Sequence, residues 1–88
     1  MLKNYNFRHW YIPERMLESL ERYKNDGTIP GDFLVSILSN DLVAACGRAD
    51  DENLANLPAY GAYVYNELPG PSWGSKENVL LWHEYKNK

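Results

Sequence analysis

A polar stretch in the middle of the chain, residues 39–53, carries the side chains best suited to binding chemistry. Arg48 is its only basic residue, and a planar guanidinium binds a carboxylate or a phosphate through two parallel hydrogen bonds. Two helix ends within the stretch would bring its polar side chains together. The candidate binding residues in it are Asn40, Asp41, Arg48, Asp50 and Asn53.

A purely structural interpretation accounts for the same residues. Asn40 and Asp50 would cap helices, because short polar side chains accept hydrogen bonds from the free N–H groups of a helix start. Arg48 would pair with Asp41 or Asp50 and so fasten two helices together. The sequence leaves both interpretations open.

Trp73 is the sixth candidate binding residue. It lies between a Pro-Gly-Pro turn and Ser75, where it would either plug the bottom of a small core or stand out as an interface anchor. The chain has seven Tyr, three Trp and two Phe, and on so small a body many of the tyrosines are expected at the surface. Tyr and Trp are enriched in interfaces. This composition favours a binding role, and half-buried tyrosines at the core edge are the alternative.

The sequence contains no catalytic or metal-binding pattern. The two histidines, His9 and His83, lie far apart, and neither has a second ligand at a metal-binding spacing. Cys46 is the only cysteine, which excludes an internal disulfide and a cysteine-based zinc site within one chain. Its small neighbours predict that it is buried. The motifs of serine hydrolases, zinc proteases and phosphate loops are missing, so we predict a protein that is not an enzyme and that binds neither a metal nor a cofactor.

Charge and hydropathy exclude two further classes of protein. The net charge is −3, whereas nucleic-acid binding requires a basic surface to meet the phosphate backbone. No apolar run reaches the roughly 18 residues of a membrane-spanning helix, and no signal-peptide pattern opens the chain. A chain of 88 residues with 44% hydrophobic and 24% charged residues is expected to form one globular domain, residues 1–88.

The spacing of apolar residues predicts an all-α domain of four to five short helices with an extended N-terminal arm. The arm comprises residues 1–11, in which Tyr5 and Phe7 alternate with polar residues. Such alternation is typical of extended chain or of a short strand. A single strand is not stable alone, so it would have to pack on the helices or on another subunit.

The first helix is expected to begin at Pro13, because proline suits a first helical position. It ends at Gly27, which can take the left-handed conformation. Residues 32–46 would form one helix or two, and Ser39-Asn40-Asp41 favours a break because these side chains compete for backbone hydrogen bonds. Gly47 is expected to end this segment.

The second half of the chain contains two further helical segments. A helical stripe runs from about residue 50 to residue 67, and Pro58 within it either kinks the helix or marks a restart with Asn56 as the cap. Pro69-Gly70-Pro71 breaks the chain. Ser75 then caps the last helix.

Several short motifs occur together over about residues 11–82. They include Tyr11-Ile12-Pro13-Glu14-Arg15-Met16, Pro30-Gly31-Asp32-Phe33-Leu34, Leu38-Ser39-Asn40-Asp41-Leu42, Gly47-Arg48-Ala49-Asp50, Tyr65-Asn66-Glu67-Leu68-Pro69 and Trp73-Gly74-Ser75. The combination resembles a group of small accessory proteins encoded in tailed-phage and prophage genomes. Where that group has a Ser-Gly-Cys-Trp-like turn, this chain has Gly70-Pro71-Ser72-Trp73, which weakens any role for a thiol there. The resemblance implies an accessory phage protein made in an infected bacterium, and it transfers no functional residue.

Two functional hypotheses follow. The leading one is a non-enzymatic phage protein of the host bacterial cytoplasm that binds a host protein and inhibits host defence or metabolism. The alternative is a protein that binds or sequesters a small nucleotide signal. In that case Arg48 would meet the phosphate, Asn40 and Asn53 would read polar edges, and a Tyr or Trp would stack on the base. Such a site would be completed between the subunits of a homo-oligomer.

Overall fold

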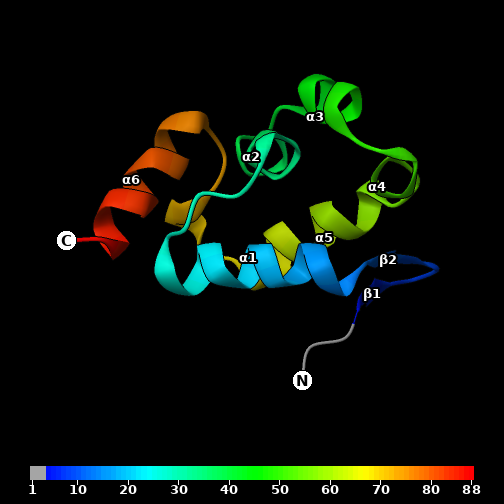
Figure 1. Ribbon diagram of the computed structural model, residues 1–88, viewed down its shortest axis with the longest axis horizontal. Coiled ribbons are helices and arrows are strands. Elements are labelled where there is room, and N and C mark those ends of the chain that lie inside the picture. The colour runs from blue at the N-terminus through cyan, green and yellow to red at the C-terminus, as the bar shows by residue number, and fades with distance from the viewer. Residues whose placement is uncertain (1–3) are drawn as a thin grey trace.

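The computed structural model describes residues 4–88, which form six α-helices and one two-stranded sheet (Figure 1). The mostly helical character is as predicted, but the domain is not purely α-helical and has more helices than four or five. No helix among the described residues is both long enough and apolar enough to cross a membrane. In chain order the elements are β1 (Tyr5–Phe7), β2 (Trp10–Ile12), α1 (Glu14–Asp26), α2 (Asp32–Leu38), α3 (Leu42–Arg48), α4 (Asp51–Ala55), α5 (Leu57–Glu67), the 3-10 turn η1 (Gly70–Ser72) and α6 (Lys76–Lys86).

The N-terminal segment is a β-hairpin and not an extended arm. β1 and β2 pair in antiparallel fashion, with Tyr5 opposite Ile12. The turn between them places Arg8 at φ 56°, a left-handed conformation that residues other than glycine rarely adopt. Neither turn residue, Arg8 or His9, is a glycine or asparagine that would mark a hairpin turn in the sequence. The hairpin packs on α5, where the Tyr5 ring meets the Tyr63 ring edge-on at 5.2 Å between centroids. Residues 1–3 of the predicted arm lie outside the described residues.

Helix α1 ends as predicted but begins one residue later than expected, at Glu14, because Pro13 is its N-cap and not its first helical residue. Pro13 immediately precedes it, and Gly27 ends it at φ 72° while donating its N–H to the Tyr23 carbonyl oxygen at 2.9 Å. Charged residues occupy the outer face, whereas Leu17, Leu20 and Tyr23 are buried. This division is the amphipathic pattern expected of a surface helix.

The predicted break between α2 and α3 is confirmed. Asn40 has φ 61°, which asparagine tolerates better than most residues, and Asp41 caps α3 by accepting the Ala44 N–H at 3.1 Å. The expected end at Gly47 is wrong, because α3 continues through Gly47 to Arg48. The helix ends only where the Asp50 cap of α4 follows it.

The remaining helix starts follow from their caps. Asp50 accepts the Asn53 N–H at 2.8 Å and starts α4. Helix α5 restarts after Asn56 with Pro58 in its first turn, where proline costs no hydrogen bond. Ser75 caps α6 by accepting the Asn78 N–H at 3.0 Å. The cap at Ser75 is as predicted. Of the two alternatives at Pro58, the structure shows the restart and not the kink, although the Asn56 side chain forms no cap hydrogen bond.

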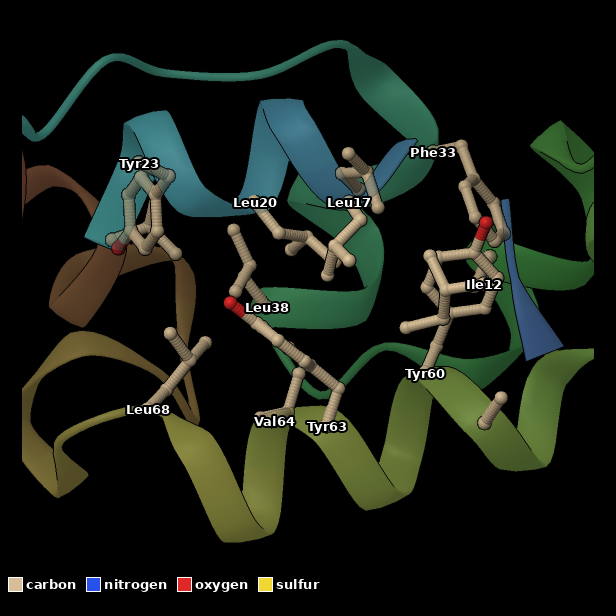
Figure 2. Close-up of a cluster of buried hydrophobic side chains, with 14 of the residues drawn as sticks. Ile12, Leu17, Leu20, Tyr23, Phe33, Leu38, Tyr60, Tyr63, Val64 and Leu68 are labelled. Carbon is tan, nitrogen blue, oxygen red and sulfur yellow. The ribbon is translucent and has the colours of Figure 1, made fainter. Parts of the chain in front are cut away.

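The hydrophobic core lies between α1 and α5. Figure 2 shows side chains of these two helices facing each other across it, with Leu38 of α2 between them. Three of the seven tyrosines (Tyr23, Tyr60 and Tyr63) are buried in this core, whereas Tyr65 and Tyr85 are exposed, so the expectation that many tyrosines lie at the surface holds for only part of them. Each buried hydroxyl donates to one acceptor: Ser72 O at 2.7 Å, Asn53 Oδ1 at 2.5 Å and Glu21 Oε2 at 2.5 Å, respectively.

Helix α6 closes the domain by holding the C-terminal end of α1 (Figure 1). The buried Trp82 donates its indole N–H to the Tyr23 carbonyl oxygen at 3.0 Å. His83 Nδ1 lies 2.7 Å from the Gly27 carbonyl oxygen, which can only accept, so Nδ1 carries the proton. Trp82 therefore adds a second hydrogen bond to a carbonyl oxygen that already accepts the Gly27 N–H, and His83 bonds to the carbonyl oxygen of the residue that ends α1.

Candidate functional site

The α2–α3 corner and the Trp73 loop together form an apolar groove of about 270 Å³. The Gly74 N–H donates to the Leu38 carbonyl oxygen at 2.8 Å, and Asn78 Nδ2 donates to the Trp73 carbonyl oxygen at 2.9 Å. The first bond holds the Trp73 loop against the end of α2, and the second holds it against the first turn of α6. The groove is lined by Ser36, Ile37, Asn40, Asp41, Leu42, Ala45, Leu57, Gly61, Val64, Tyr65 and Trp73.

Three of the six candidate residues (Asn40, Asp41 and Trp73) line this groove. Trp73 is half-buried and packs against the edge of the core, which agrees with the core-edge position that the sequence allowed; its role as an interface anchor stays a prediction. Large apolar side chains around the groove are exposed, with exposed fractions of 66% for Leu42 and 77% for Tyr65. The neighbouring Val43 is 84% exposed. The groove thus has apolar walls, an apolar rim and polar groups on the α2–α3 corner.

Arg48 lies in a second cavity, of about 380 Å³, which we call the basic pocket. It is lined by Val35, Ser36, Ser39, Asp41, Arg48, Gly74, Ser75 and Lys76. Arg48 Nη1 donates to Ser36 Oγ at 2.7 Å, and Ser36 Oγ in turn donates to the Asp32 carbonyl oxygen at 2.9 Å. Within residues 4–88 the Arg48 guanidinium forms no ion pair, so the expected pairing with Asp41 or Asp50 is not present.

Asp50 pairs with Arg15 of α1, at 3.4 Å between Oδ2 and Nη2. Arg15 also meets Glu52 Oε1 at 3.1 Å, and the Tyr11 hydroxyl donates to Glu52 Oε2 at 2.6 Å. Hydrogen bonds from Tyr11 and Arg15 lower the pKa of Glu52, and the same bonds raise the pKa values of Tyr11 and Arg15. This polar clasp joins β2, α1 and α4, and Asp50 has a structural role in it.

Asn53 is buried, and its side chain accepts the Tyr60 hydroxyl in the core. Neither Asn53 nor Asp50 lines the groove or the basic pocket. The six candidates therefore separate into three groove residues, with Asp41 shared by both cavities, one basic-pocket residue and two structural residues.

The sequence did not identify Lys76, Ser39 or Tyr65 as candidates. In the sequence, Lys76 is an ordinary residue of the first helical turn after the cap Ser75. It comes close to Arg48 only because α6 packs against α2. Cys46 was expected to be buried but is exposed, because it lies on the outer face of α3 and Ala45 turns inward in its place.

The histidines lie away from both cavities. His83 is held by the Gly27 carbonyl oxygen, and the His9 ring lies against the Trp10 ring at 4.0 Å between centroids. Neither lines the groove or the basic pocket. Among residues 4–88, no three histidine, cysteine or acidic side chains lie close enough to hold a metal ion.

Comparisons with known protein families, with curated proteins and with solved structures found no match to this chain. The groove and the basic pocket are therefore the two features from which a function can be inferred. The groove offers apolar contact area. The basic pocket offers positive charge.

Proposed function

We propose that the protein is a non-enzymatic binding protein whose groove receives an apolar segment of a partner protein. The observation that carries this proposal is the exposed apolar rim formed by Leu42 and Tyr65, which both line the groove. Val43, the residue after Leu42, is exposed as well. Small proteins seldom expose large apolar side chains next to one another unless the patch is covered by a partner. The separation of both histidines from the cavities supports a role without catalysis.

The groove suits the apolar face of an amphipathic helix or a few apolar anchor residues. Helix-in-groove recognition uses anchors at i, i+3/i+4 and i+7 of the partner, and aromatic residues dominate the binding free energy of such interfaces. Trp73 forms part of the wall and Tyr65 stands at the rim. Each large anchor that is fully buried contributes about 1.5–3 kcal/mol, so three anchors reach the range of micromolar affinity, about 8 kcal/mol, before the costs of association.

The resemblance to tailed-phage and prophage proteins supports a partner from the infected bacterium. On this proposal the protein acts in the host bacterial cytoplasm and inhibits a component of host defence or metabolism. The groove would cover a surface that the host protein needs for its own function.

The test compares capture of host proteins by the wild type and by groove variants. Leu42→Glu places a charge at the rim, and Tyr65→Ala removes an aromatic side chain. Leu80→Glu is the matched control, because Leu80 is also exposed, at 47%, but belongs to α6 and does not line the groove. We expect a stoichiometric partner to be recovered with the wild type and Leu80→Glu and lost with both groove variants, while circular dichroism shows an unchanged fold.

Recovery of the same proteins by wild type and Leu42→Glu would contradict the proposal. A second copy of the chain is the competing occupant of the groove. Light scattering over a range of concentrations distinguishes it: a dimer that Leu42→Glu dissociates would assign the groove to self-association.

A further inference from the structure

We propose that the basic pocket binds the phosphate group of a mononucleotide, with the base entering the adjoining groove. Arg48 and Lys76 are consecutive basic residues of the sequence, separated by a long stretch without another. The fold nevertheless places both in the wall of one cavity. The phosphate site differs from the apolar rim that carries the protein-binding proposal, but the base would occupy the groove that the partner segment also uses, so the two ligands would compete for it.

Arg48 is held ready to bind an anion. Because the Ser36 hydroxyl donates to the Asp32 carbonyl oxygen, its lone pairs are left to accept Arg48 Nη1 at 2.7 Å. One hydrogen bond orients the guanidinium while its other N–H groups remain available. No carboxylate of residues 4–88 lies within ion-pair distance of it. A fixed guanidinium is suited to two parallel hydrogen bonds with phosphate.

The start of α6 adds further donors. Ser75 satisfies the N–H groups of Asn78 and Val79 through its side chain and its carbonyl oxygen, which leaves those of Lys76 and Glu77 without an acceptor inside the helix. Helix α6 has 11 residues, and the positive end of its dipole favours an anion. Lys76 adds a mobile positive charge at the same place.

A second observation at this cavity is the Ser39 hydroxyl. Ser39 follows α2 and is one of the residues that line the basic pocket. Its hydroxyl oxygen is buried and has no hydrogen-bond partner within residues 4–88. Buried hydroxyls are nearly always paired. Because this oxygen has less than 1 Å² of accessible surface, a ligand in the pocket would become its partner only after the Ser39 side chain rotates toward the pocket.

The charge of the pocket contrasts with that of the whole chain. The net charge is −3, yet the pocket wall holds two cations and one carboxylate, Asp41. Asp41 Oδ1 accepts the Ala44 N–H at 3.1 Å, so this carboxylate is engaged by the start of α3. The two positive side chains therefore outnumber the single carboxylate in the pocket wall, and this net positive charge favours binding of an anion.

The neighbouring groove indicates which chemical group, joined to the phosphate, the ligand carries. The two cavities share Ser36 and Asp41 and therefore lie side by side. On this proposal one molecule extends past these two residues from the basic pocket into the groove. A nucleobase would find the Tyr65 and Trp73 rings and the polar groups of Asn40 and Asp41 in the groove. A free phosphate would use the basic pocket alone.

Calorimetry with inorganic phosphate, ribose 5-phosphate and the adenine, guanine, cytosine and uracil mononucleotides tests this proposal on the full chain. We expect at least one nucleotide to bind more tightly than ribose 5-phosphate or phosphate. Arg48→Gln and Lys76→Gln should each weaken its binding about tenfold or more. Arg22→Gln on α1, outside the pocket, is the matched control and should bind as the wild type does.

Binding of none of the nucleotides, or equal binding by wild type and Arg48→Gln with an unchanged melting temperature, would overturn the proposal. Equal affinity for phosphate and every nucleotide would overturn the assignment of a nucleotide. Arg48→Gln distinguishes the two proposals, because it removes the phosphate contact and leaves the groove lining unchanged, so capture of a protein partner should persist. Leu42→Glu alters the groove that both proposals use and does not separate them.

Discussion

At the scale of single residues, the buried tyrosines decide how polar groups are accommodated in this core. Tyr60 is fully buried and bonds to the buried side chain of Asn53. The pair keeps Asn53 in the core although the sequence presents it as a surface residue. A polar residue in a helix stripe can therefore be a core residue when an aromatic hydroxyl is its partner.

We expect Tyr60→Phe to lower the free energy of unfolding by about 1–3 kcal/mol, because the Asn53 amide oxygen loses its partner inside the core. Chemical denaturation measures this difference. Tyr65→Phe is the control, since Tyr65 is 77% exposed, and should change stability by less than about 0.5 kcal/mol. Equal effects of the two substitutions would contradict the role given to the Tyr60–Asn53 bond.

The buried tyrosines also predict a response to alkaline pH. Burial raises the pKa of Tyr23 from 10.0 to about 12 and raises the pKa values of Tyr60 and Tyr63 as well. A raised tyrosine pKa favours the neutral form in the folded state, so this contribution to stability is complete below pH 10 and is lost as the pH rises toward 12. We expect part of the tyrosinate absorbance to appear only together with loss of the helical circular dichroism signal. Complete tyrosine ionisation of a chain that is still helical would contradict this.

At the scale of elements, two glycines have opposite roles. Gly27 ends α1 in the left-handed conformation, and a Cβ added there would lie 2.6 Å from Lys86 Cβ of α6. Gly47 lies inside α3 with nothing within 4 Å of an added Cβ. The first glycine is required by a close helix contact, whereas the second only weakens its helix.

The same substitution should therefore act in opposite directions at these positions. Gly27→Ala is expected to destabilise the protein by about 1–2 kcal/mol from the left-handed conformation alone, with a further loss from the contact with Lys86. Gly47→Ala should stabilise it by about 1 kcal/mol, because alanine is the better helix former. Melting curves of the two variants beside the wild type measure both effects, and the same sign for both would contradict this account.

At the scale of the whole molecule, local signals predicted most helix ends, though not that of α3, which runs past Gly47 to Arg48. Contacts between residues distant in sequence decided the rest of the fold. Gly27 and Ser75 act through bonds within their own helices, so spacing and residue type sufficed to place them. The hairpin that turns at Arg8 packs against α5, and the residues next to Arg8 in the sequence contain no pattern that predicts this contact. The site shows the same division: Asn40 and Asp41 lie close together in sequence and were found, whereas Lys76 approaches Arg48 only through the packing of α6 on α2.

The polar clasp predicts how the assembled fold responds to acid. Hydrogen bonds from Tyr11 and Arg15 lower the pKa of Glu52 below 4.5, so its contribution to stability is present above that pH and is lost as the pH falls through the lowered pKa. We expect Glu52→Gln to be less stable than the wild type near neutral pH and to converge with it in acid. Tyr11→Phe should show a smaller effect in the same direction. Urea denaturation at several pH values measures the difference, and a constant gap between wild type and Glu52→Gln would contradict the role of the clasp.

The grip of α6 on the end of α1 also constrains when the protein can fold. Val79 and Trp82 are core residues, and Trp82 bonds to a carbonyl oxygen of the first helix. During translation, which adds about 5–20 residues each second, the first five helices emerge while their shared core still lacks these side chains. The core can close only after the ribosome has released residue 82. Nascent chains arrested before that point should remain open to proteases, and those arrested well after it should be protected.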